Sequence, residues 1–346
     1  MSAPFELGLD TFGERTQGPG GELVSHAQAL RDVVEQAVLA DRVGLDFIGL
    51  GEHHRDDFAI AAPEVLLAAI AARTTRIKLG TAVTILSTDD PIRVFQRFST
   101  LAAISSGRAE AILGRGSFTE SFPLFGLDLG DYELLFEEKL AIFAAARSGE
   151  PVRWEGRHRA PIDVARVVPP TETGLLPTWV GVGGTPPSVV RAARYGFSLM
   201  LAIIGGDPVR FAPFAELYRD ALRELGRDPL PVGVHAPGHV AETDEQAREE
   251  LWPHFLEQRT RIGGERGWPP PTRAQFEREA GPNGAVFVGS PRTVADKVVA
   301  TARALGLRRF DLKYANGAMP HAQLMKSIEL IGNEVAPRVR AALADA

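Results

Sequence analysis

Short runs of apolar, β-branched residues alternate along the whole chain with longer stretches in which apolar residues recur at helical spacing. This alternation predicts a repeat of strand and helix, with the apolar stripe of each helix packed on the outside of a sheet. Eight runs have the length and composition of buried strands. They cover residues 5–10, 45–50, 77–86, 109–114, 178–182, 197–203, 231–240 and 308–314. Eight strands alternating with helices predict an α/β fold of the (β/α)8 TIM-barrel type.

An open, doubly wound sheet is the rival fold for the same alternation. That fold needs a glycine-rich fingerprint directly after the first strand, where the phosphates of a dinucleotide bind. The segment 10–15, Asp-Thr-Phe-Gly-Glu-Arg, contains no such fingerprint. The barrel is therefore the preferred prediction.

Two segments interrupt the repeat. Residues 116–168 contain one predicted helix, 131–147, followed by an irregular piece or a hairpin, and residues 252–285 are rich in proline and glycine. In a barrel such segments are insertions in the loops that follow the strands, where lids and substrate walls are found. We expect a single domain over residues 1–346 that carries both insertions.

The composition narrows the classes of function. The 346 residues carry a formal charge of −6 and include no cysteine, which excludes disulfides, thiolate nucleophiles and cysteine-bound metals. No long run of like charge suggests a nucleic-acid partner, and nowhere do 18 apolar residues follow one another as a membrane span requires. Since the N-terminus shows no secretory signal, we expect a cytoplasmic enzyme.

Two adjacent histidines, His53 and His54, follow the predicted strand 45–50. The C-terminal ends of barrel strands form the catalytic face, so these imidazoles are candidates for acid–base catalysis. A metal site is the weaker interpretation, because neighbouring strand residues point to opposite faces and an H-x-H spacing is missing. We expect no metal here. A purely structural role for the pair remains open.

A glycine-rich turn, Gly183-Gly184-Thr185, joins the predicted strand 178–182 to a helix that begins at Pro186. Glycines let the backbone approach an anion, while the Thr185 and Ser188 hydroxyls lie where the helix dipole favours negative charge. This pattern favours a phosphate site. A tight turn that needs glycine only for its conformation is the alternative.

Arg115 lies between two glycines at the end of the strand 109–114. Its small neighbours leave room for a ligand, and its planar guanidinium suits a phosphate or a ring carbonyl. A surface salt bridge is the competing interpretation of this arginine.

Taken in order along the chain, these motifs resemble the bacterial luciferase-like monooxygenase superfamily of flavin- and deazaflavin-dependent (β/α)8 barrels. The resemblance covers nearly the whole chain and no single motif decides it. It rests on the Glu52-His53-His54 motif, the run Gly80–Val83 followed by Asp90–Arg93, Gly107-Arg108 with Gly114–Gly116, Gly183–Thr185 with Arg191–Gly196, and Gly289–Lys297.

The resemblance implies a cofactor, reduced FMN or alternatively F420, across the mouth of the barrel. Its phosphate would lie on Gly183, Gly184, Thr185 and Ser188 with Arg115 nearby. Ala82-Val83 corresponds to the family's non-prolyl cis peptide, which supports the flavin ring. His53 corresponds to the histidine that in luciferases assists chemistry at the flavin ring, and His54 to its neighbour. The resemblance also implies a homodimer and a possible NAD(P)H:flavin reductase as partner.

Two positions depart from the luciferase pattern. Asp90 stands where luciferases usually carry histidine, and Glu133 stands where they place a second phosphate-directed arginine. The resemblance nevertheless predicts a flavin-dependent monooxygenase that oxidises a small organic substrate with O2. F420-dependent hydride transfer, a flavin-binding protein without catalysis and a metal-dependent hydrolase remain the alternatives.

Overall fold

Eight parallel strands close into a barrel in the computed structural model, which describes residues 4–172 and 174–344. The strands are β1 (Glu6–Thr11), β2 (Phe47–Leu50), β3 (Lys78–Thr81), β5 (Ala109–Gly114), β8 (Thr178–Val182), β9 (Ser198–Ala202), β10 (Val232–Val240) and β12 (Arg309–Lys313). They pair in this order, and β12 pairs with β1 to close the ring. Seven lie within the predicted runs and β1 extends one residue beyond its run, so the predicted fold is confirmed. The single-domain prediction for residues 1–346 stays a prediction, and its two ends lie outside the described residues.

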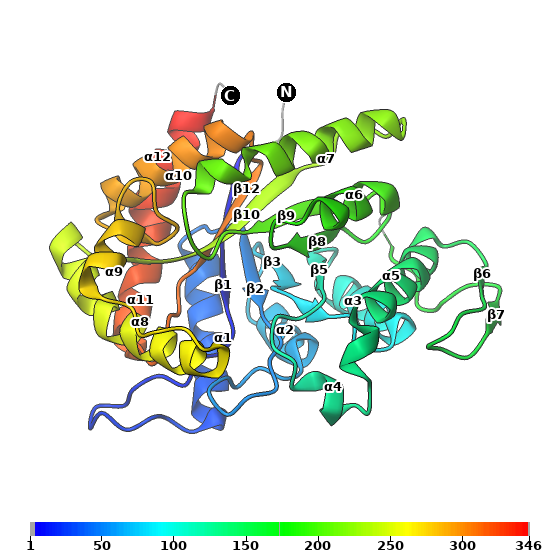
Figure 1. Cartoon of the computed structure of the whole chain (residues 1–346), viewed down its shortest axis with the longest axis horizontal. Coiled ribbons are helices and arrows are strands. Elements are labelled where there is room, and N and C mark those ends of the chain that lie inside the picture. Colours follow the sequence, from blue (N-terminus) through cyan, green and yellow to red (C-terminus); the bar gives the residue numbers. More distant parts are fainter. Residues whose placement is uncertain (1–3, 173, 345–346) are drawn as a thin grey trace.

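Helices surround the strands, as Figure 1 shows. Those between and after the barrel strands are α1 (His26–Arg42), α2 (Pro63–Ala71), α3 (Pro91–Ile104), α6 (Pro186–Tyr195), α7 (Ala212–Glu224), α10 (Pro291–Leu305), α11 (His321–Leu330) and α12 (Ala336–Leu343). Several begin where a hydroxyl or carboxylate caps free backbone N–H groups, as Asp90 does at the start of α3. Among the helices of the described residues, none combines the length and apolar character needed to cross a membrane.

The interior of the barrel contains charged groups as well as apolar ones. Along β12, Phe310 and Leu312 alternate with Arg309, Asp311 and Lys313, and all five residues are buried. The Arg309 guanidinium lies 2.6 Å from Glu110 and 2.9 Å from Asp311. It also lies 3.4 Å above the centre of the Phe47 ring. Buried charges are tolerated only when paired, and these contacts pair the charged groups of the barrel interior.

The first insertion agrees with its prediction. It contains a short helix, α4 (Ser121–Leu124), the helix α5 (Tyr132–Ser148) and a hairpin of β6 (Val152–Trp154) and β7 (Ile162–Val164). A two-residue strand after β3, β4 (Thr84–Ile85), pairs with the end of β5. In Figure 1 the hairpin lies on the side of the barrel opposite α8 and α9.

The second insertion is more regular than its composition predicts. The helix α8 (Asp244–Arg266) runs through Pro253, and a second helix, α9 (Arg273–Ala280), follows. Aromatic packing orders the segment: the Phe276 ring centre lies 5.3 Å from that of Trp252 and 5.1 Å from that of Phe255. A three-residue strand, β11 (Phe287–Gly289), pairs with the end of β10 outside the closed ring and was not predicted.

Candidate active site at the barrel mouth

His53 lies in an aromatic cluster at the C-terminal end of β2. Its ring centre is 4.6 Å from that of Phe12, 4.6 Å from that of Phe58 and 5.1 Å from that of Phe118. The Nδ1 atom is buried and has no hydrogen-bond partner among the described residues. A buried polar atom without a hydrogen-bond partner destabilises the fold, so this one points to a bound ligand or to a role in proton transfer.

Burial sets the charge state of this imidazole. Loss of hydration, together with the nearby positive charges of Lys313 and Arg55, lowers the pKa of His53 from 6.5 to about 3. At neutral pH His53 is therefore uncharged. It offers one N–H donor and one lone pair to the mouth of the barrel.

His54 is held by Glu52, which also fixes the neighbouring loop. His54 Nε2 lies 2.9 Å from Glu52 Oε1, and Glu52 Oε2 accepts the backbone N–H of Ile85 at 2.8 Å. The backbone N–H of Glu52 donates to the carbonyl of Val83 at 3.2 Å. One carboxylate thus connects the histidine loop after β2 to the loop between β3 and β4.

The peptide bond between Ala82 and Val83 is cis, as expected from the resemblance. Glycines surround it: a Cβ on Gly114 would lie 2.5 Å from Val83 Cγ2, and one on Gly181 would lie 3.0 Å from Val83 Cγ1. A larger residue at either position would displace the Val83 side chain. The half-buried Val83 packs on Phe47, Ile112, Trp179 and Met200, which form an apolar floor within the barrel.

The predicted phosphate loop lies two residues beyond Gly181. Gly183 is exposed, and a Cβ there would meet no atom within 4 Å. Gly184 has a φ of +99°, and a Cβ on it would lie 3.2 Å from both Phe211 and Phe214. The two glycines therefore differ: Gly184 is needed for the turn, whereas Gly183 borders open space.

Thr185 does not cap the helix that it precedes. Its hydroxyl donates to Ser188 Oγ at 2.8 Å, and the next two residues, Pro186 and Pro187, have no backbone N–H. Two of the donors that a helix normally presents to an anion are therefore missing. An anion at this turn would depend on the backbone of residues 183–185, on the two hydroxyls and on nearby arginines.

Arg115 forms a salt bridge with Glu133 and lies over the ring of Tyr132, with its guanidinium carbon 5.3 Å from the ring centre. The other carboxylate oxygen of Glu133 lies 3.3 Å from Arg191 Nη2. The Arg191 Nη1 atom is buried and has no hydrogen-bond partner among the described residues. Sequence reasoning missed Arg191 as a cation of this site, although its position one turn after Ser188 was a signal.

Arg55 connects both insertions to the histidine loop. Its guanidinium contacts Asp57, Glu120 of the first insertion and Glu265 of the second. It lies 4.7 Å from the centre of the Phe118 ring. These ion pairs place the insertions beside His53, as expected for walls of a substrate site.

A second imidazole lies at the mouth and was not among the predicted site residues. His235 of β10 has its Nδ1 atom 2.7 Å from Oδ2 of Asp10, which is fully buried on β1. The rings of His235 and Phe12 are nearly parallel, with their centres 6.2 Å apart. The inward positions of the strand 231–240 could have identified His235, because Gly233 and His235 alternate with apolar residues that face outward.

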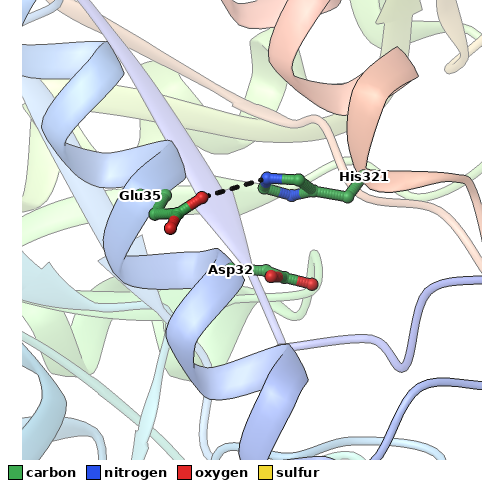
Figure 2. A group of neighbouring side chains, drawn as sticks. All are labelled: Asp32, Glu35 and His321. Atoms are coloured by element: carbon green, nitrogen blue, oxygen red, sulfur yellow. Dashed lines mark ion pairs between the residues drawn. The ribbon is translucent and has the colours of Figure 1, made fainter. Parts of the chain in front are cut away.

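A group of possible metal ligands lies outside the mouth, where Asp32 and Glu35 of α1 approach His321 at the start of α11 (Figure 2). His321 Nε2 lies 3.5 Å from Glu35, and His321 Nδ1 lies 3.0 Å from Gln36 Nε2. Tyr314 donates to the Gln36 carbonyl oxygen at 2.6 Å, so the amide presents its N–H to the ring. This places the ring proton on Nε2, the atom that a metal would need, and directs it towards Glu35.

The sequence model of the luciferase-like monooxygenase family matches residues 11–309. Limonene 1,2-monooxygenase of Rhodococcus erythropolis is 31% identical over 229 residues, which are 64% of this chain and 58% of that protein. 4-Hydroxyprotoasukamycin monooxygenase of Streptomyces nodosus subsp. asukaensis is 28% identical over 327 residues, 90% of this chain and 87% of that protein. For two uncharacterized proteins of Sinorhizobium fredii, the chain spans about half of their length, 50% and 51%.

Solved structures share the fold over almost the whole chain. The monooxygenase RslO1 of Streptomyces bottropensis has a TM-score of 0.82 and 24% identity, covering 96% of this chain and 99% of that one. The oxygenating constituent of 3,6-diketocamphane monooxygenase from Pseudomonas putida, in complex with FMN, has a TM-score of 0.78 and 23% identity, covering 97% and 98%. The F420-dependent tetrahydromethanopterin reductase of Methanopyrus kandleri has a TM-score of 0.72 and 20% identity, covering 97% and 100%.

Proposed function

The chain belongs to the luciferase-like monooxygenase family, and from this membership we propose that it is a monooxygenase that uses reduced FMN and O2 to oxidise a small organic substrate. One observation supports the proposal most directly. The loop that carries His53, the cis peptide Ala82–Val83 and the turn at Gly183 are contiguous at the barrel mouth. Glu52 connects the His53 loop to the cis peptide. Gly181, two residues before the turn at Gly183, packs against Val83 of that peptide.

The residues present fit a phosphate-bearing cofactor. Gly183 leaves open space where a Cβ would otherwise stand, and Arg191 keeps one buried guanidinium nitrogen unpaired among the described residues. Backbone N–H groups of residues 183–185 and the hydroxyls of Thr185 and Ser188 would hold the phosphate. Glu133 neutralises part of the positive charge here, which agrees with a flavin that binds and leaves. A separate NAD(P)H:flavin reductase would then supply it in reduced form.

When bound, the reduced flavin supplies the electrons with which O2 is activated. The protein positions and protects the reactants. Val83 and the apolar floor beneath it support a flat ring, and the phenyl rings around His53 exclude water. His53 is neutral at pH 7, so it donates or accepts a hydrogen bond without adding charge beside the ring.

F420-dependent hydride transfer is the second candidate function, because the fold is shared with F420-dependent enzymes. Isotope labelling separates the two functions. The protein is supplied with FMN, NADH, a flavin reductase and 18O2, and a panel of small apolar compounds is screened by mass spectrometry. Incorporation of one 18O atom into a product supports the monooxygenase. Turnover with reduced or oxidised F420 and without O2 contradicts it.

Assembly and partners are proposed on the same basis. We propose a homodimer, with a small organic molecule as substrate and a flavin reductase as a transient partner. A light-scattering mass of a monomer contradicts the dimer.

A further inference from the structure

The Asp10–His235 pair has the geometry of a carboxylate that orients an imidazole. Asp10 is fully buried on β1, and its Oδ2 atom lies 2.7 Å from Nδ1 of His235. The His235 side chain keeps 13% of its surface exposed, and no described residue hydrogen-bonds to its Nε2 atom. The ring is therefore fixed on one side and open on the other.

The contact determines which nitrogen carries the proton. An ionised carboxylate only accepts hydrogen bonds, so Nδ1 of His235 donates its proton to Asp10. The lone pair of the neutral ring is then on Nε2, at the side that remains open. An arrangement of this kind stabilises the imidazolium that forms when Nε2 takes up a proton.

Few charged groups besides Asp10 face the His235 ring without a partner of their own. In the strand register His235 faces Ala202 on β9 and Asp311 on β12, and Phe12 stacks on its ring. Asp311 is paired with Arg309, and Lys313, two residues further along β12, is paired with Glu14. The groups that face His235 are thus Asp10, the Asp311–Arg309 pair, a methyl group and an aromatic ring.

The two imidazoles at the mouth differ in what they can do. His53 lies in an aromatic cluster without a carboxylate partner, and burial keeps it neutral. His235 contacts the same Phe12 ring and has a buried carboxylate behind it. Of His53 and His235, only His235 has the carboxylate partner that a proton acceptor needs. The third imidazole, His54, shares its partner Glu52 with the backbone N–H of Ile85.

We propose that His235 is a catalytic base for the organic substrate, that Asp10 is its positioning residue, and that the substrate carries an acidic O–H group such as that of a phenol or enol. The proposal rests on the proposed function and deepens it. Nε2 takes the substrate proton, the O–H electron pair stays on the oxygen, and an oxyanion–imidazolium pair results. An oxyanion is more electron-rich than its parent alcohol and is the better partner for an oxygenating cofactor.

The test uses 4-nitrophenol as a probe, because its ionised form absorbs visible light and its neutral form does not. The full-length protein without added flavin is titrated with the probe at a pH below the pKa of the phenol. We expect the ionised fraction of bound probe to exceed that of free probe by about tenfold, which corresponds to one pKa unit. His235→Asn and Asp10→Asn should both remove this increase. His321→Asn is the matched control, since His321 is also paired with a carboxylate but lies outside the mouth.

The outcomes separate this proposal from the proposed function. Ionisation of the probe that is lost in both variants and kept in His321→Asn supports it. Absence of probe binding, binding without ionisation, or ionisation that survives His235→Asn overturns it. If the bound probe is still ionised in Asp10→Asn but not in His235→Asn, the positioning role of Asp10 is wrong. Reduced FMN is titrated into the same preparation: if FMN binds while the probe stays neutral, only this inference fails, and if FMN does not bind, the proposed function itself fails.

Discussion

Replacing Glu133 by glutamine should strengthen the binding of FMN. Glu133 pairs with Arg115 through one carboxylate oxygen and approaches Arg191 Nη2 to 3.3 Å through the other. A flavin phosphate at the turn of residues 183–185 has to compete with this carboxylate for both guanidinium groups. Glutamine keeps the size of the side chain but removes the competing charge and one of the two oxygens that accept from the arginines.

The size of the effect follows from exposure. The Glu133 side chain is 57% exposed and that of Arg115 24%, so water and salt screen the interaction. Exposed ion pairs contribute up to about 1 kcal/mol, and releasing one arginine for the phosphate should gain a similar amount, roughly a fivefold lower Kd. The gain should shrink as the salt concentration rises.

The assay is an anaerobic titration of the wild-type and Glu133→Gln proteins with reduced FMN and reduced riboflavin. FMN should bind more tightly to the variant, whereas riboflavin, which has no phosphate, should bind both proteins equally. Glu150→Gln changes the net charge identically at an exposed residue after α5 and is the control. An unchanged or higher Kd for FMN, or an equal gain for riboflavin, would refute the assignment of the phosphate to this turn.

Four further outcomes are expected. Gly183→Val should abolish FMN binding and keep the thermal unfolding of the wild type, because its side chain enters open space; normal binding would place the phosphate elsewhere. Arg309→Met should cost about 3–5 kcal/mol in urea unfolding, since it leaves the buried Asp311 carboxylate unpaired and removes one partner of the buried Glu110, and a loss below 1 kcal/mol would contradict this. The pKa of His53 is about 3 in the folded protein and 6.5 in the unfolded chain, so between these values His53 takes up a proton only on unfolding. The free energy of unfolding should therefore fall by about 2 kcal/mol from about pH 7 to pH 5. A His53→Phe variant should lack that loss in urea titrations. Arg55→Ala should accelerate amide hydrogen exchange in both insertions; unchanged exchange would mean that they are held by other contacts.

The barrel could be predicted because parallel strands with both faces covered are read as continuous apolar runs. The run 77–86 continues past β3 and includes the cis peptide, whose position came from the resemblance. The charged interior could not be predicted. Arg309 lies in a strand where charged and apolar residues alternate, and its partner Glu110 is 199 residues away along the chain, so no local pattern connects them.

The candidate site was predicted in part. Position at a strand end was enough to place His53 and the turn at Gly183 near the mouth. For Arg115 the sequence left a phosphate ligand and a salt bridge open, and the structure shows the salt bridge with Glu133. His235 was missed because its partner Asp10 comes from a strand more than 200 residues earlier, and only closure of the barrel brings them together.

Side-by-side anaerobic titration of the wild-type protein with reduced FMN and reduced F420, followed by admission of oxygen, decides between the monooxygenase and hydride transfer. Reduced FMN should bind more tightly than reduced F420, and its rate of oxidation once oxygen enters should differ from that of free FMN. Tighter binding of F420 together with an oxygen-insensitive complex would contradict the monooxygenase assignment. Binding of neither cofactor would leave the turn at Gly183 and the pair of arginines with a structural role only.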